Sequence, residues 1–155
     1  MESLEHPGKF EEEKGIEELA LKYQKGDEIP VAFEKKEGSV GIFHLILEGH
    51  KIGVFTITDP EKDFGRKSDI KVKQIGYVRI NDLFKNKGLG KQFYIKLNEH
   101  MHSIDGSFLE SGDMTSVFAD RVWHSLFKDG LVIKSGTNPF GEDTFRFTEK
   151  LDDTI

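Results

Sequence analysis

Residues 84–94, FKNKGLGKQFY, place glycines and lysines directly before an apolar pattern of helical period. The first amides of a helix have no intrahelical partner and lie at the positive end of its dipole, so together they can bind an anion. Gly88 and Gly90 carry no Cβ that would keep an anion from the backbone. Positive charge comes from Lys85, Lys87 and Lys91. The stretch predicts a phosphate site, and the alternative is an ordinary strand-to-helix turn with surface lysines.

The best-known phosphate loops do not fit this stretch. A P-loop needs Ser or Thr after its Gly-Lys pair and a glycine five residues before that pair, but Gln92 follows Lys91 and Lys85 occupies the earlier position. A dinucleotide-binding fingerprint needs a third glycine at Phe93. The remaining pattern is a strand, a basic turn with Gly-x-Gly, and a helix.

The elements before this turn follow from a change in hydrophobic period. Helical spacing over residues 10–25 predicts a charge-rich first helix that ends before Gly26. Alternating apolar residues then predict strands, with a hairpin turn at 48–51 and an exposed loop at 60–69. The predicted strands span 31–36, 39–49, 50–59 and 70–80.

After the turn, helical and strand patterns alternate. Apolar residues at every fourth position from Leu89 to Met101 predict a helix with one face on the core. A strand over 106–111, a helix starting from Thr115 or Ser116 as N-cap and ending at Gly130, and strands over 131–136 and 143–150 follow. This order predicts one α/β (α+β) domain over 1–155, with helices flanking a mixed sheet of about six or seven strands.

Composition narrows the function further. The 155 residues include no cysteine, which excludes disulfides, thiolate zinc sites and cysteine nucleophiles. A formal net charge of -6 disfavours sequence-independent nucleic-acid binding and suits a basic substrate such as an amine. No metal site is expected, because His100 and His102 lie on different faces of their helix and no metal-binding motif occurs. With no membrane-spanning run and no signal peptide, a cytoplasmic protein is predicted.

The segment IGYVRINDLFKNKGLGKQFYIKL resembles motif A of the GNAT superfamily of N-acetyltransferases, whose loop reads Arg/Gln-x-x-Gly-x-Gly/Ala. Lys85, Gly88 and Gly90 fall on its three marked positions, with Lys in place of Arg or Gln. The segment FLESGDMTSVFADRVWHSLFKDG is similar to the strand, polar turn and helix that follow in the family. Small acetyltransferase-like proteins of bacteriophages and bacteria are the most similar in pattern.

This resemblance implies a GNAT-like fold and acetyl-CoA as the cofactor. It implies that the turn amides hold the coenzyme A pyrophosphate and that the backbone of the preceding strand pairs with the pantetheine arm. The turn residues are Lys85, Asn86, Lys87, Gly88, Leu89, Gly90 and Lys91, and the strand residues are Arg79, Ile80 and Asn81. It also implies that Ser111, Gly112 and Trp123 line the cleft between two splayed strands.

Direct acyl transfer needs an uncharged amine and a donor that stabilises the oxyanion. A backbone amide near Ile80 is the candidate donor, and the acceptor is a small-molecule amine or a protein lysine or N-terminus. Candidate bases are Asp113, Glu110 and Tyr77, in that order. Each has a structural alternative: a turn or cap for Asp113, exposure to solvent for Glu110, and packing for Tyr77.

One residue departs from the family pattern in a way that concerns catalysis. Many members carry a tyrosine that protonates the leaving thiolate, on the helix that corresponds to the one predicted here before Gly130. Trp123 is the residue that aligns with this tyrosine. An indole cannot supply that proton. The alternative is therefore a GNAT-fold binding or inhibitory module that has lost acetyl transfer, in a phage context.

Overall fold

A computed structural model describes residues 7–59, 71–85, 88–112 and 116–148, with side chains from residue 12 onward. Seven strands and four helices follow one another in the predicted alternation, with one short helix added. The helices are α1 (Pro7–Lys22), α2 (Asp82–Lys85), α3 (Gly90–Asp105) and α4 (Val117–Lys128). The strands are β1 (Val31–Lys35), β2 (Ile42–Leu47), β3 (His50–Thr58), β4 (Val72–Ile80), β5 (Phe108–Ser111), β6 (Val132–Thr137) and β7 (Asp143–Phe147).

All seven strands form one mixed sheet in the order β1-β2-β3-β4-β5-β7-β6. Only β4 and β5 run parallel, and the crossover between them contains α3. Their pairing begins at Val72 with Phe108 and ends at Ile75 with Ser111. Because β4 continues to Ile80, its last five residues extend past the end of this pairing, and the sheet opens there.

A bulge lies in β4 where the sheet opens. Phe55 pairs with Val78 and Ile57 pairs with Ile75, so β4 has one more residue than β3 between these pairs. The Tyr77 amide donates to Thr56 Oγ1 over 2.6 Å instead of to a backbone carbonyl. The bulge interrupts the alternation of buried and exposed side chains and re-aims the strand at the opening.

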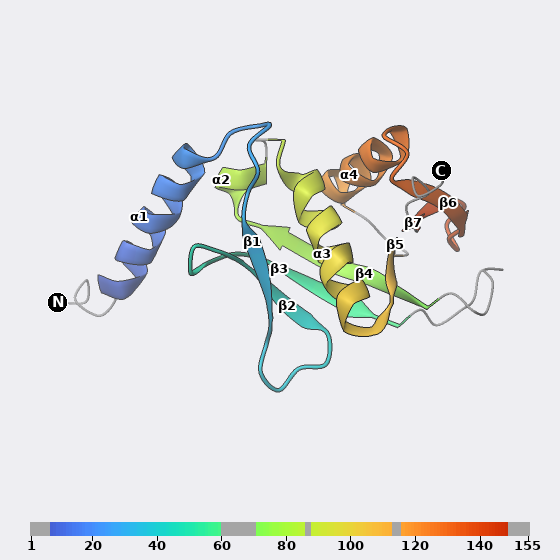
Figure 1. The fold of residues 1–155 in the computed structure, drawn as a ribbon, viewed down its shortest axis with the longest axis horizontal. Coiled ribbons are helices and arrows are strands. Elements are labelled where there is room, and N and C mark those ends of the chain that lie inside the picture. Colours follow the sequence, from blue (N-terminus) through green and yellow to red (C-terminus); the bar gives the residue numbers. More distant parts are fainter. Residues whose placement is uncertain (1–6, 60–70, 86–87, 113–115, 149–155) are drawn as a thin grey trace.

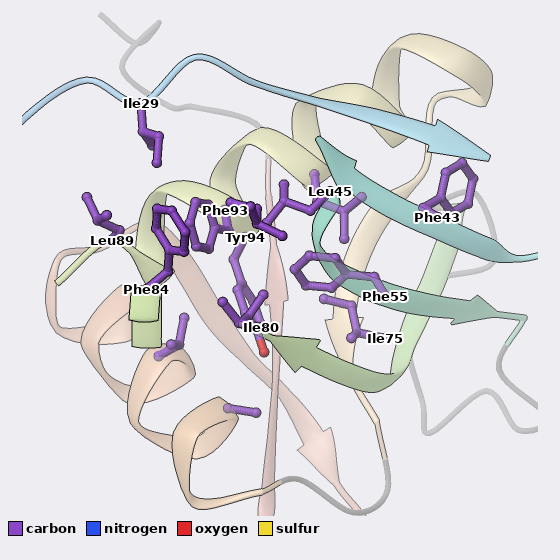
Figure 2. Close-up of a cluster of buried hydrophobic side chains, with 14 of the residues drawn as sticks. Ile29, Phe43, Leu45, Phe55, Ile75, Ile80, Phe84, Leu89, Phe93 and Tyr94 are labelled. Atoms are coloured by element: carbon purple, nitrogen blue, oxygen red, sulfur yellow. The ribbon is translucent and has the colours of Figure 1, made fainter. Parts of the chain in front are cut away.

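Helices α3 and α4 cover one face of the sheet, and their apolar sides supply much of the core (Figure 1). Figure 2 shows Phe93 and Tyr94 of α3 against Leu45, Phe55 and Ile80 of the sheet. The predicted N-cap of α4 is Ser116, whose Oγ accepts a hydrogen bond from the Ala119 amide over 3.1 Å. The helices predicted from periodicity thus have the expected apolar faces.

Helix α1 lies beside the end of the sheet that carries the β2–β3 turn (Figure 1). The turn needs only two residues, Glu48 (φ 48°) and Gly49 (φ 84°), which are both left-handed as in a tight hairpin turn. Tyr23, just after α1, donates from its hydroxyl to Glu48 over 2.6 Å. Among the described residues, no helix is long and apolar enough to cross a membrane.

The short helix α2 was not predicted. It is one turn long, which is too short to show a hydrophobic period. Asn81 starts it, because its Oδ1 accepts a hydrogen bond from the Leu83 amide over 2.9 Å and its carbonyl accepts one from Phe84 over 2.9 Å. Phe84 is fully buried and anchors the turn.

Asp105 provides a pH-dependent contribution to stability at the end of α3. It accepts hydrogen bonds from the Ser107 amide (2.9 Å) and hydroxyl (2.5 Å). Partial burial by itself would raise the pKa of Asp105, but these bonds and the positive charges of Lys71 and Lys73 outweigh burial and lower it. A depressed folded-state pKa stabilises the fold above the unfolded-state pKa, and this contribution is lost as the pH falls through the folded-state pKa.

Asp105→Asn is expected to lower the free energy of unfolding by about 1 kcal/mol at neutral pH, because two hydrogen bonds to a charged acceptor are weakened. Urea unfolding of both proteins at about pH 7 and about pH 3 tests this, and the difference should shrink at the lower pH. An equal difference at the two pH values would show that the charge of Asp105 does not stabilise the fold.

Candidate functional site

The N-terminus of α3 has the features of an anion site. Its cap residue, Leu89, provides no side-chain hydrogen bond, and the first turn contains no acidic residue. The Gln92 and Phe93 amides donate to the Leu89 carbonyl over 3.1 and 3.3 Å, whereas the Gly90 and Lys91 amides come before the first intrahelical bond. A cavity of about 170 Å³ lies here, lined by Lys85, Gly88, Gly90, Lys91, Phe118, Arg121, Val122 and Ser125.

Three of these lining side chains are cationic, and they come from three helices. Lys85 on α2 lies 3.4 Å from Asp82, and Lys91 on α3 pairs with Asp129. Arg121 reaches the cavity from an exposed position on α4. Together with the uncapped helix terminus, these charges suit a ligand with more than one negative charge. Asn86 and Lys87, which were also predicted to bind the pyrophosphate, lie outside the described residues.

The two glycines have a structural reason in addition to the predicted one, which stays a prediction. We expected them to leave room for an anion, but a Cβ on Gly90 would lie 3.0 Å from Phe118 Cζ and 3.2 Å from Val122 Cγ2. Gly90 therefore lets α3 start in close contact with α4. Gly88 has a left-handed backbone (φ 74°), and a Cβ there would lie 2.8 Å from Lys25 Cγ.

The free edge of β4 provides backbone groups next to this helix terminus. The Asn81 amide donates to the Ile52 carbonyl over 2.8 Å, on one side of the pair formed by Gly53 and Ile80. In an antiparallel ladder this makes Gly53 and Ile80 a non-hydrogen-bonded pair, so the N–H and C=O of Ile80 point to the other edge of β4. Since β5 pairs only as far as Ile75, these two groups face the opening of the sheet.

A second cavity, of about 170 Å³, occupies the opening between β4, α3 and α4. Its lining consists of Ile75, Gly76, Tyr77, Val78, Tyr94, Ser116, Ala119 and Trp123. Tyr77 is 54% exposed, whereas Tyr94 and Trp123 are buried. The cavity is therefore mostly apolar, and its polar groups are the tyrosine and serine hydroxyls, the Trp123 indole N–H and the groups of the β4 backbone.

On the far side of Trp123 lies a third cavity, of about 180 Å³. Its lining consists of Ser111, Gly112, Asp120, Trp123, His124, Asn138, Glu142, Asp143 and Phe145. The structure thus brings the three predicted cleft residues, Ser111, Gly112 and Trp123, to one place. Three carboxylates share this lining with them, so the cavity is acidic where the α3 terminus is basic.

No protein-family model and no curated protein matches the sequence. Solved structures do match. A GNAT family acetyltransferase from Listeria monocytogenes superposes with a TM-score of 0.50 at 16% identity, over 68% of this chain and 63% of that one. The aminoglycoside acetyltransferase AAC(6')-Ib in complex with coenzyme A superposes with a TM-score of 0.51 at 18% identity, over 73% of this chain and 69% of that one. The chain has a GNAT-like α/β fold.

The GNAT-like fold confirms the fold predicted from the resemblance, and at these identities the match concerns the fold alone. The chain spans 63% of the length of the Listeria protein that it matches. The opening between β4 and β5 and the basic terminus of α3 lie in the elements that carry the predicted motif. A cytoplasmic location and the similarity to phage proteins stay predictions.

The predicted bases have different surroundings. Glu110 is fully buried, so the alternative that it points to solvent is wrong. Its Oε1 accepts a hydrogen bond from Gln74 Nε2 over 3.1 Å, and Arg146 lies opposite it on β7. Tyr77 is exposed rather than packed, because the bulge turns it outward next to the opening. Asp113 lies outside the described residues.

The structure adds two residues that the sequence reasoning missed, Arg121 and Tyr94. Arg121 is one helical turn after Val117 on a helix that was read only for its apolar face. Tyr94 is next to Phe93, and only Phe93 fits the four-residue spacing used to predict α3. A polar atom at the edge of an apolar stripe was the available signal. In the described part of the chain, no three His, Asp or Glu side chains gather to hold a metal ion.

Proposed function

We propose that the protein is an acyl-CoA-dependent N-acyltransferase, most simply one that transfers acetyl from acetyl-CoA directly to an amine. The observation that carries the proposal is the basic cavity at the α3 terminus, next to a β4 edge that the neighbouring strand leaves open. One part suits a pyrophosphate and the other suits an extended chain with amide groups. GNAT-fold similarity to AAC(6')-Ib, solved with coenzyme A, supports this reading.

The residues present fit each part of the cofactor. The Gly90 and Lys91 amides, with Lys85 and Arg121, would hold the pyrophosphate, and the Ile80 carbonyl would accept a hydrogen bond from the pantetheine arm. When bound, acetyl-CoA would supply the acetyl group: the acceptor nitrogen forms a bond to the acyl carbon, the carbon–sulfur bond breaks, the amine loses a proton and the thiolate gains one. The Ile80 N–H is the donor that we propose for the developing oxyanion.

The acceptor would enter from the acidic cavity beyond Trp123. Asp120, Glu142 and Asp143 line it, and their negative charge attracts an ammonium group before it is deprotonated for attack. His124 lies 3.4 Å from Asp120 in the same lining. The proposed acceptor is therefore a cationic amine, on a small molecule or as a protein lysine or N-terminus.

Isothermal titration with coenzyme A tests the cofactor site. Arg121→Glu is expected to weaken binding about tenfold or more, because a charge-assisted contact to phosphate becomes a repulsion. Arg121 is exposed, so the substitution leaves the core intact. This variant replaces substitutions at Gly90, which would also disturb the packing of α3 on α4.

Lys128→Glu is the matched control, since it makes the same charge change on the same helix at a residue outside the cavity lining. Its dissociation constant for coenzyme A should stay within about twofold of the wild-type value, because Lys128 does not line the cavity and salt screens an exposed charge. If the wild type does not bind coenzyme A, the proposed function is wrong. If the two variants weaken binding equally, the ligand does not occupy this cavity.

A second function is favoured by one observation. Among the described residues that line the cavity of the opening, none is a carboxylate or a histidine that could act as a base. The protein would then bind the cofactor as a module without transferring its acyl group. Release of free thiol from acetyl-CoA in the presence of a panel of amines separates the two functions, because the module binds acetyl-CoA but produces no thiol above the rate without protein.

A further inference from the structure

The hydroxyl of Tyr94 is a buried polar group without a partner among the described residues. The side chain has no exposed surface, and its oxygen makes no hydrogen bond within the part of the chain that the structure describes. Figure 2 shows Tyr94 extending from α3 into the cluster between sheet and helices, with its oxygen at the end. Such a group costs about 1–3 kcal/mol relative to one that is satisfied, so it calls for an explanation.

The surroundings fix the direction of this hydroxyl. The Tyr94 ring packs edge-on against the Phe55 ring on the sheet side, with 5.6 Å between ring centroids. On the α4 side it packs edge-on against the Trp123 ring, with 5.5 Å between centroids. Tyr94 also lines the cavity in the opening of the sheet, together with the backbone of Gly76 and Val78. Two aromatic rings therefore hold Tyr94, with its hydrogen-bond donor, beside this cavity.

The rest of the lining makes the donor distinctive. Ser116 is exposed and its Oγ accepts the hydrogen bond that caps α4, and Tyr77 is more than half exposed to water. Among the side chains of the described lining, Tyr94 thus has a hydroxyl that is shielded from water and makes no hydrogen bond within the described residues, and the Trp123 indole N–H is the other buried donor. A donor of this kind gains most when a charge develops beside it.

We propose that the Tyr94 hydroxyl donates a hydrogen bond to the sulfur of the bound thioester and stabilises it as it leaves as a thiolate. The inference rests on the proposed acyl transfer and assigns a catalytic residue to it. Tyr94 keeps its own proton throughout, while the amine loses a proton and the departing thiolate takes up one. Burial raises the pKa of Tyr94, which keeps the hydroxyl protonated and available as a donor.

Binding measurements test this without knowledge of the acceptor. The dissociation constants of coenzyme A and of desulfo-coenzyme A, which lacks the sulfur atom, are measured by titration calorimetry for the wild type and Tyr94→Phe. The pH is about 9.5, above the ordinary thiol pKa of about 8.5, so that the sulfur is a thiolate. Tyr94→Phe should raise the dissociation constant of coenzyme A about tenfold or more, since a hydrogen bond to a charged group is lost. The dissociation constant of desulfo-coenzyme A should stay within about twofold of the wild-type value.

The outcomes separate this inference from the function on which it rests. If the wild type binds neither nucleotide, the proposed function and the role of Tyr94 are both wrong. In another outcome, the wild type binds both ligands while Tyr94→Phe either leaves the affinity for coenzyme A unchanged or weakens the affinity for both ligands equally. In that case only the role of Tyr94 is wrong. A selective loss for the ligand that carries sulfur supports it, because a purely structural hydroxyl would not distinguish the two.

Stability of the free protein provides a second readout. Tyr94→Phe removes an unsatisfied hydroxyl and keeps the ring, so the midpoint of urea unfolding should stay equal or rise. Tyr23→Phe is the matched control, since the Tyr23 hydroxyl donates to Glu48 over 2.6 Å. This substitution should lower the midpoint of urea unfolding and leave the affinities for both nucleotides unchanged. A lower midpoint for Tyr94→Phe would assign its hydroxyl to a structural hydrogen bond and contradict the inference.

Discussion

Replacing Trp123 by alanine is expected to lower the free energy of unfolding by about 3–5 kcal/mol. Trp123 is only 1% exposed, and its ring packs against the rings of Tyr94 on α3 and Phe147 on β7, with 5.5 and 5.7 Å between ring centroids. Trp123 also lines both the cavity of the opening and the acidic cavity. Alanine would remove these contacts and enlarge spaces that already exist beside the indole, so little of the new volume could be filled by relaxation.

Urea unfolding measures this loss, with Val117→Ala on the same helix as the control. Val117 is 70% exposed, and its truncation should change the free energy of unfolding by less than about 0.5 kcal/mol. A loss for Trp123→Ala as small as that of the control would mean that the indole does not hold α4 against the sheet. Trp123 would then be free for a role in the cleft alone.

Gly112→Ala is expected to cost about 1–3 kcal/mol, because it inserts a methyl group where there is no space. A Cβ on Gly112 would lie 2.6 Å from the Ile75 carbonyl oxygen, a backbone atom of the neighbouring strand. Neither atom belongs to a flexible side chain, so β4 and β5 would have to move apart. The change acts at Ile75 and Ser111, the last pair before the sheet opens.

Gly76→Ala is the comparison, since it adds the same methyl group on β4, directly after Ile75 and beside the cavity of the opening. The nearest atom to its Cβ would be Thr56 Oγ1 at 3.1 Å, a side-chain atom that can shift slightly. Thermal and urea unfolding should therefore show a smaller loss for Gly76→Ala than for Gly112→Ala. Equal losses would mean that the cost of Gly112→Ala does not come from the spacing of the two strands.

The elements that could be predicted from the sequence are those with a clear hydrophobic period. The helix starting near Leu89 and the helix capped by Ser116 have the expected apolar faces, and the hairpin turn lies within 48–51. Each was predictable because a local pattern determines it. The mixed sheet followed from the order of these elements, which allows few arrangements.

Other features depend on contacts between segments that are distant in the sequence. The bulge in β4 results from pairing with β3, and the packing role of Gly90 requires knowing that Phe118 lies against it. The buried state of Glu110 depends on its position between β4 and β7. Tyr94 shows the limit most clearly, because no sequence pattern reveals whether a buried hydroxyl has a partner.

Because the parallel pairing of β4 with β5 is short, the two parts of the sheet on either side of it should differ in the rate of backbone amide hydrogen exchange. Four residue pairs join β4 to β5, and the register of β5 with β7 contains the single pair of Glu110 and Arg146. Strands β1 to β4 pair with long antiparallel neighbours. The β6–β7 hairpin can therefore unfold locally as a cooperative unit of its own. Its amides should exchange through local unfolding of lower free energy than the unfolding that exposes the amides of β2 and β3.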